Sequence, residues 1–109
     1  MPNSKVRFTI DALEDIRELR QWYRKRNPRL VDVIDLELRR LTTAIAQRPL
    51  SYPIVHHPYR RALLRKFPYM ILFEQEENRS LVFACMHTRR GDRQWINEVL
   101  RRNPMPAPT

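Results

Sequence analysis

One histidine and several basic side chains are the residues of this sequence whose types and spacing could do chemistry. His87 is followed by Arg89 and Arg90, and Arg65 and Lys66 lie further upstream. Cleavage of RNA by its own 2′-hydroxyl requires a base, an acid for the leaving oxygen and cations around the phosphate. Histidine exchanges protons near neutral pH, and guanidinium groups bind phosphate through paired hydrogen bonds. The pattern therefore indicates either a centre for phosphodiester cleavage or a surface that only binds anions.

The proton-transfer groups of such a cleavage centre are incomplete. Thr88 follows His87, and the chain beyond Leu100 contains no tyrosine, histidine or carboxylate side chain. If the protein cleaves RNA, its catalytic residues are His87, Arg65 and Arg89. We favour a structural role for His87, in which a histidine at the end of a strand is hydrogen-bonded to the backbone. The arginines then bind carboxylate or phosphate groups of a partner without transferring protons.

The other candidate residues are better explained by structure than by chemistry. His56 and His57 lie in a proline-rich segment and are expected at the surface. Cys85 and His87 share one face of a strand, but no second ligand pair follows at metal-binding spacing, so we expect no metal and no cofactor. Trp95 could stack on a base, yet its apolar neighbours favour a role as the anchor of the last helix.

The charge of the chain predicts acidic partners. The 109 residues include 21 basic and 12 acidic side chains, which leaves a formal charge of +9. No acidic residue occurs between Glu37 and Glu74. Nucleic acid, an acidic protein and an anionic membrane surface all fit this charge. The membrane is disfavoured because the last helix, which is basic, carries too few apolar residues to bury a large area in lipid.

The sequence also predicts the compartment. Its single cysteine, Cys85, cannot form an intramolecular disulfide, as is typical of proteins in a reducing cytosol. The N-terminal segment has no apolar stretch of the kind found in signal peptides, and no segment approaches the roughly 18 apolar residues that span a bilayer. We therefore expect a cytoplasmic protein that does not enter membranes.

The first half of the chain predicts one strand and two helices. The strand alternates apolar and polar residues, as in a strand with one covered face. Asp11 is the expected N-cap of the first helix, with Glu14 as its partner in a capping box. Asn27 and Pro28 interrupt the helical pattern and start the second helix, so the two helices should form an antiparallel hairpin. The strand covers residues 4–10, and the helices cover residues 11–26 and 28–47.

The second half predicts three strands and a final helix. Prolines at positions 49, 53 and 58 predict an extended loop from Pro49 to Tyr59. The last strand is apolar at nearly every position and should be an interior strand with both faces covered. Gly91 and Asp92 end it and start the helix that carries Trp95. The strands cover Arg60–Lys66, Tyr69–Gln75 and Ser80–His87.

These elements predict one α+β domain of order β-α-α-β-β-β-α. A helical hairpin with one apolar face needs a surface to cover, and a small, mainly antiparallel sheet supplies it in two layers. The domain is expected to span residues 1–103, and residues 104–109 form a proline-rich tail.

The order of three motifs within these elements resembles the ParE/RelE toxin superfamily. Phe67-Pro68-Tyr69 begins a strand, an arginine-rich strand precedes it, and His87-Thr88-Arg89-Arg90 ends the following strand before Asp92 and Trp95. The resemblance covers nearly the whole chain. It implies the toxin of a bacterial type II toxin–antitoxin module, which forms a hetero-oligomer with a cognate antitoxin. The antitoxins of this superfamily are typically acidic where they bind the toxin, in agreement with the charge of +9.

The superfamily has two activities, and this sequence is closer to the ParE branch. ParE-like toxins poison DNA gyrase, whereas RelE-like toxins cleave mRNA on the ribosome. The incomplete acid and base set favours the gyrase inhibitor over the endonuclease. A nucleic-acid-binding module without toxicity is a third interpretation. The residues expected to bind the target or the antitoxin are Arg60, Arg61, Arg65, Lys66, Arg89, Arg90 and Trp95.

Overall fold

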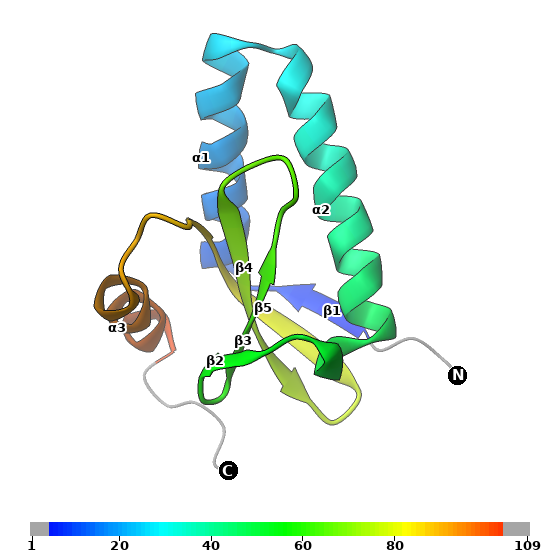
Figure 1. Ribbon diagram of the computed structural model, residues 1–109, viewed down its shortest axis with the longest axis vertical. Helices are drawn as coiled ribbons and strands as arrows, with labels where there is room; N and C mark the ends of the chain where they lie inside the picture. Colours follow the sequence, from blue (N-terminus) through cyan, green and yellow to red (C-terminus); the bar gives the residue numbers. More distant parts are fainter. Residues whose placement is uncertain (1–4, 104–109) are drawn as a thin grey trace.

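A five-stranded mixed sheet forms the centre of the protein, with helices on both of its faces (Figure 1). The computed structural model describes residues 5–103, so the predicted proline-rich tail lies outside the described residues. The predicted order of elements is confirmed. The elements are β1 (Lys5–Phe8), α1 (Ile10–Arg26), α2 (Arg29–Gln47), the 3-10 helix η1 (Pro49–Ser51), β2 (Ile54–His56), β3 (Tyr59–Leu63), β4 (Tyr69–Glu76), β5 (Arg79–His87) and α3 (Asp92–Arg102).

The N-terminus of α1 differs from the prediction. The N-cap is Thr9, not Asp11, because Thr9 has extended backbone angles directly after β1 and its Oγ1 accepts a hydrogen bond of 3.1 Å from the Ala12 amide. Asp11 lies within the first turn, where a negative charge interacts favourably with the helix dipole. Glu14 accepts hydrogen bonds from Arg17 instead of completing a capping box.

The predicted helical hairpin is confirmed. Asn27 ends α1, and its Oδ1 accepts a hydrogen bond of 3.2 Å from the Arg29 amide at the start of α2. Pro28 occupies the N-cap position of α2. Arg20 on α1 donates from Nε to Asp35 Oδ1 on α2 at 2.9 Å, so an ion pair joins the two helices along their length.

The strand order is β1-β5-β4-β3-β2, in which β1 runs parallel to β5 and the other neighbours are antiparallel. The segment predicted to be a loop contains η1 and the short strand β2, which pairs with β3 at the edge of the sheet. The prediction missed β2 because it has three residues, and Pro53 and Pro58 flank it. A strand as short as this is stabilised by its partner and not by its own residue pattern.

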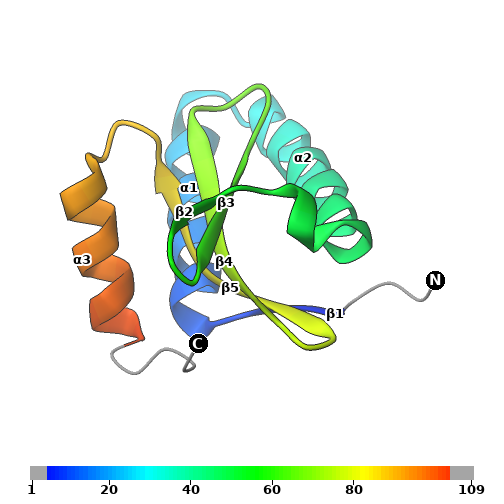
Figure 2. The same cartoon turned by 60° about the horizontal axis from the view of Figure 1, so that its bottom comes forward.

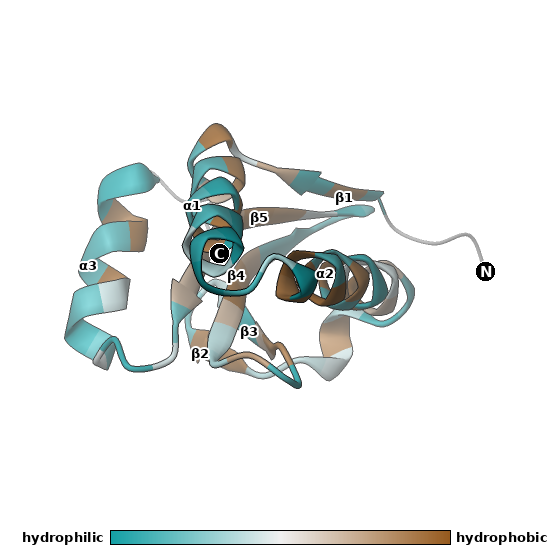
Figure 3. Cartoon of the chain, turned by 90° about the horizontal axis from the view of Figure 1, so that it is seen from above, coloured by the Kyte–Doolittle hydropathy of each residue, from teal (hydrophilic) through white to brown (hydrophobic). Residues whose placement is uncertain are grey.

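The two faces of the sheet are covered by different helices. The α1–α2 hairpin packs on one face, around Ile34, Phe73 and Val82, and α3 packs on the other through Trp95 and Val99. Seen from above in Figure 3, the apolar positions of these helices are turned toward the strands. The helix α3 therefore adds cover on the face that the two-layer prediction left open.

The strand β5 is an interior strand between β1 and β4, as predicted. Its register against β4 shifts between Leu72 and Phe73, so that Leu72 pairs with Ala84 and Phe73 with Val82. Phe83 is the extra residue of this bulge. Both faces of β5 are buried beneath helices, which explains why its sequence is apolar without alternation.

The topology brings the β3–β4 loop beside the C-terminal end of β5. Tyr69, at the start of β4, pairs with His87, and the Thr88 amide donates a hydrogen bond of 2.8 Å to the Pro68 carbonyl. This end of the sheet is visible where β4 begins in Figures 1 and 2. Basic residues of the β3–β4 loop and of the β5–α3 connection consequently lie at the same end.

Candidate functional site

The sheet end next to His87 holds four of the predicted binding cations. Arg65 and Lys66 lie in the β3–β4 loop, and Arg89 and Arg90 lie in the connection from β5 to α3. All four are exposed, and His87 is partly exposed. Residues that are distant in the sequence meet here because antiparallel pairing places the start of β4 against the end of β5.

The remaining predicted binding residues do not belong to this end. Arg60 donates a hydrogen bond of 2.6 Å from Nη1 to the Tyr52 carbonyl, so it fixes the segment before β3. Arg61 pairs with Leu72 within the sheet. Successive side chains of a strand point to opposite faces, so Arg60 and Arg61 cannot form one cationic cluster.

Trp95 is part of the core and is not a binding residue in this structure. Its side chain is 2% exposed, and its indole Nε1 donates a hydrogen bond of 3.1 Å to Asp92 Oδ1. It packs with Met86 and Val99 between α3 and the sheet. The interpretation of Trp95 as the anchor of the last helix is confirmed.

Glu37 positions the β3–β4 loop. Its carboxylate accepts a hydrogen bond of 2.6 Å from the Arg65 amide and one of 2.9 Å from the Lys66 amide. Phe67 is buried next, with its ring 5.1 Å from that of Tyr23. The sequence analysis missed Glu37, although a carboxylate on the apolar face that contains Ile34 signals a buried acceptor.

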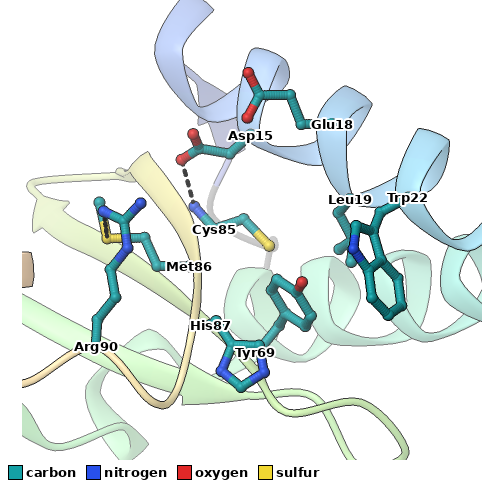
Figure 4. A pocket seen from close by; sticks show the side chains of 9 residues that line it. All are labelled: Asp15, Glu18, Leu19, Trp22, Tyr69, Cys85, Met86, His87 and Arg90. Carbon is teal, nitrogen blue, oxygen red and sulfur yellow. Dashed lines mark hydrogen bonds between the residues drawn. The ribbon is translucent and has the colours of Figure 1, made fainter.

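A groove between α1 and the end of β5, here called the α1–β5 groove, is the most developed hollow near His87. It holds about 230 Å³ and opens into a second hollow of about 570 Å³ that Trp22, Tyr69, His87 and Arg90 also line. Figure 4 shows Trp22 on one wall, with Tyr69 and His87 opposite and Arg90 beside them. Arg89 lines the wider hollow. The groove thus combines aromatic walls with two guanidinium groups.

The ring of His87 is held by the backbone. Its Nδ1 accepts a hydrogen bond of 2.9 Å from the Arg89 amide, and its ring lies edge-on to that of Tyr69 with centroids 5.0 Å apart. The predicted structural role of this histidine is therefore confirmed. Since Nδ1 must be unprotonated to accept this bond, the proton of the neutral ring is on Nε2.

The other ionisable groups around the groove are poorly disposed to work with His87. Burial, followed by the proximity of Tyr23 and Cys85, raises the pKa of Tyr69. Asp15 accepts hydrogen bonds from Arg102 and from the Cys85 amide. Burial raises the pKa of the Cys85 thiol to about 12, so the thiol stays protonated at neutral pH.

Trp22 is the functional candidate that the sequence analysis undervalued. It was expected at the edge of the core, but its side chain is 47% exposed and lines the α1–β5 groove. The guanidinium carbon of Arg26 lies 3.6 Å from the centroid of the indole ring, a cation–π contact that holds the ring in place. A large aromatic beside the apolar stripe of a helix is the sequence signal for such a position.

The fold and this groove define a small basic α+β domain whose exposed guanidinium groups can bind anions. A family model described as the ParE toxin of the type II toxin–antitoxin system parDE matches residues 6–92. The chain therefore belongs to the ParE toxin family, and it is a toxin of the type II class. None of the curated proteins compared with the chain matches it.

A solved structure has the same fold. It is titled the chromosomal ParDE TA system from P. aeruginosa, and it matches with a TM-score of 0.68 and 12% sequence identity. The match covers 77% of this chain and 95% of that one. Within residues 5–103, no helix combines the length and the apolar character that a membrane crossing requires.

Proposed function

We propose that this member of the ParE family blocks bacterial DNA gyrase without performing chemistry and that a cognate antitoxin neutralises it in the cytoplasm. The observation that carries the proposal is the state of the groups beside Arg89 and Arg90. His87 already accepts a backbone hydrogen bond, and Asp15 is paired with Arg102. The two exposed guanidinium groups then act as anion-binding groups without an acid and base beside them.

The proposal is tested with purified gyrase and supercoiled DNA. The wild-type protein should accumulate cleaved DNA–gyrase complexes. Replacing both Arg89 and Arg90 by Gln should weaken this effect by about tenfold or more, since each charge-assisted hydrogen bond contributes about 1.5–3 kcal/mol. Arg24→Gln, at an exposed position near the end of α1, is the control and should behave as wild type. Equal potency of the double variant and the control would contradict the role of the two arginines.

One observation favours a second candidate, a ribosome-dependent mRNA endonuclease. His87, Tyr69, Arg89 and Arg90 line one hollow, which has the composition of a site for an RNA phosphate and its base. On programmed ribosomes the endonuclease interpretation predicts mRNA cuts that disappear in His87→Ala. The gyrase interpretation predicts no cuts, and it predicts that His87→Ala keeps most of its effect on gyrase if the fold is intact.

A further inference from the structure

The outer face of α2 carries a groove on the other side of the β3–β4 loop from the α1–β5 groove. Two adjoining hollows form it, of about 300 Å³ and 440 Å³, and both are lined by Leu36 and Arg40. Because the lining residues recur at helical spacing from Val33 to Gln47, the groove is about 21 Å long at 1.5 Å per residue. This α2 groove is lined by Val33, Leu36, Glu37, Arg39, Arg40, Thr43, Ala44, Gln47, Arg65 and Lys66.

The α2 groove offers cations whose charge is not balanced within it. Its carboxylate, on Glu37, is occupied by the amides of Arg65 and Lys66. Among residues 5–103, Nη2 of Arg40 is the buried side-chain nitrogen or oxygen without a hydrogen-bond partner, and it lies 3.8 Å from Glu37 Oε1. A buried donor in this state favours an acceptor brought by a ligand.

The wall of the groove is also apolar. Leu36 is 63% exposed, although leucine at the middle of a helix is normally turned toward the core. Val33 lies one turn before it on the same face, and Ala44 continues the apolar strip toward the C-terminus of α2. An extended phosphate backbone would leave this strip uncovered, whereas the apolar face of a helix would cover it.

We propose that the α2 groove binds an amphipathic helix of the antitoxin, with apolar side chains on Val33 and Leu36 and carboxylates on Arg40, Arg65 and Lys66. That this helix belongs to the antitoxin rests on the proposed function. The acid-free stretch between Glu37 and Glu74 supplies Arg40, Arg65 and Lys66, so the charge of the surface is complementary to acidic side chains. The antitoxin would then be anchored on a different surface from Arg89 and Arg90.

The probe is a labelled synthetic helix of about 15 residues, with leucines at helical spacing on one face and glutamates on both flanks of that face. A control peptide carries glutamine in place of every glutamate. Fluorescence anisotropy with the full-length protein should show binding of the acidic peptide. The control peptide should bind about tenfold more weakly, because it lacks the charge-assisted hydrogen bonds.

Variants of the protein locate the binding surface. Leu36→Ser and Arg40→Gln should each weaken the acidic peptide by about tenfold or more, as for residues at the centre of an interface. Leu50→Ser is the matched control, because Leu50 is 69% exposed and lies outside the groove on η1. Arg24→Gln is the matched charge control. Thermal unfolding of each variant shows whether the fold is retained, and Arg39→Gln, at an exposed position, replaces Arg40→Gln if that variant is unstable.

Three results would overturn the inference. The wild-type protein does not bind the acidic peptide, Leu36→Ser and Leu50→Ser bind it equally, or Leu36→Ser weakens a single-stranded oligonucleotide more than the peptide. With the co-expressed antitoxin, Leu36→Ser should lower the affinity of the complex by about tenfold or more. An unchanged affinity would remove the antitoxin from this groove.

The gyrase assay separates this inference from the proposed function. Leu36→Ser should inhibit gyrase as strongly as wild type, because Leu36 is not part of the α1–β5 groove. If wild-type protein has no effect on gyrase but the peptide results hold, the target is wrong and the helix-binding groove stands. If the peptide results fail while gyrase is inhibited, the groove is wrong and the target stands.

Discussion

The two faces of the sheet differ in how their helices are attached. The α1–α2 hairpin covers one face through a wide apolar cluster that includes Leu19, Ile34 and Phe73. The shorter α3 covers the other face with a few apolar side chains and one ion pair between Arg102 and Asp15. A helix attached by fewer apolar contacts separates from the sheet at a lower free energy, so we expect α3 to open before the hairpin does.

Arg102 attaches α3 to a part of β5 that has no neighbouring strand. Pairing of β1 with β5 ends at Phe8 and Val82. Beyond this point, Arg102 Nη1 donates to the Phe83 carbonyl at 3.0 Å and to Asp15 Oδ2 at 2.7 Å, and the Cys85 amide donates to Asp15 Oδ2 at 3.0 Å. The ion pair therefore satisfies backbone groups that a longer β1 would have paired.

The largest expected effect comes from Trp95→Ala. Truncating a buried tryptophan lowers stability by about 3–5 kcal/mol, and here the loss should fall mainly on the docking of α3. Hydrogen exchange should show faster exchange in α3 with the amides of α2 still protected. Ile34→Ala is the contrasting variant and should lower the protection of the whole sheet, by about 2–5 kcal/mol. Identical exchange patterns for the two variants would show that both faces open together.

Arg102→Ala should destabilise α3 almost as much. Removing one partner of a buried pair leaves the other charge uncompensated and costs about 3 kcal/mol or more. Arg101→Ala is a matched control, since the neighbouring Arg101 also pairs with Glu98 but is 68% exposed. We expect its effect on chemical denaturation to stay within about 0.5 kcal/mol. Similar losses for the two arginine variants would argue against a special role for the Asp15 pair.

Glu37→Gln tests how the hairpin holds the β3–β4 loop. The variant replaces the two charge-assisted hydrogen bonds to the Arg65 and Lys66 amides by weaker ones, a loss of about 1.5–3 kcal/mol. Exchange of these two amides should accelerate, while Glu14→Gln, in an exposed pair with Arg17, should change stability little. Unchanged amide exchange in Glu37→Gln would mean that the buried Phe67 is enough to hold the loop.

The smallest effect concerns acid. Hydrogen bonds from Arg101 and Arg102 lower the pKa of Glu98 to about 2, despite an opposing contribution from burial. Because the folded pKa lies below the unfolded value of about 4.3, Glu98 stabilises the protein above about pH 4.3, and this contribution is lost as the pH falls to about 2. Denaturation measured from pH 7 to pH 2 should show a shallower decline for Glu98→Gln than for wild type. An unchanged acid limb would contradict this role.

The elements of the fold could be predicted because their signals are local. Apolar residues at helical spacing indicated both helices of the hairpin, and the continuous apolar run of β5 indicated an interior strand. The errors occurred where a local signal had two interpretations or was too short. Thr9 and Asp11 are both good N-caps, and β2 is a three-residue strand between prolines.

The candidate site was predicted only in part. His87, Arg89 and Arg90 are close in sequence, so their grouping followed from a single strand end. Arg60 and Trp95 were included because they are near other candidates in the chain, but one is bonded to the Tyr52 carbonyl and the other is buried. Trp22 was undervalued because its exposure depends on how α1 crosses the end of β5.

The sequence by itself determined the order of the elements, the basic charge and the local group at His87, because each depends on neighbouring residues or on composition. The tertiary structure decided which distant residues meet. Pairing of Tyr69 with His87 places the β3–β4 loop beside Arg89, and the Glu37 carboxylate holds the backbone of Arg65 and Lys66 against α2. Such contacts depend on strand register and helix packing across long loops, and periodicity within a single segment carries no information about either.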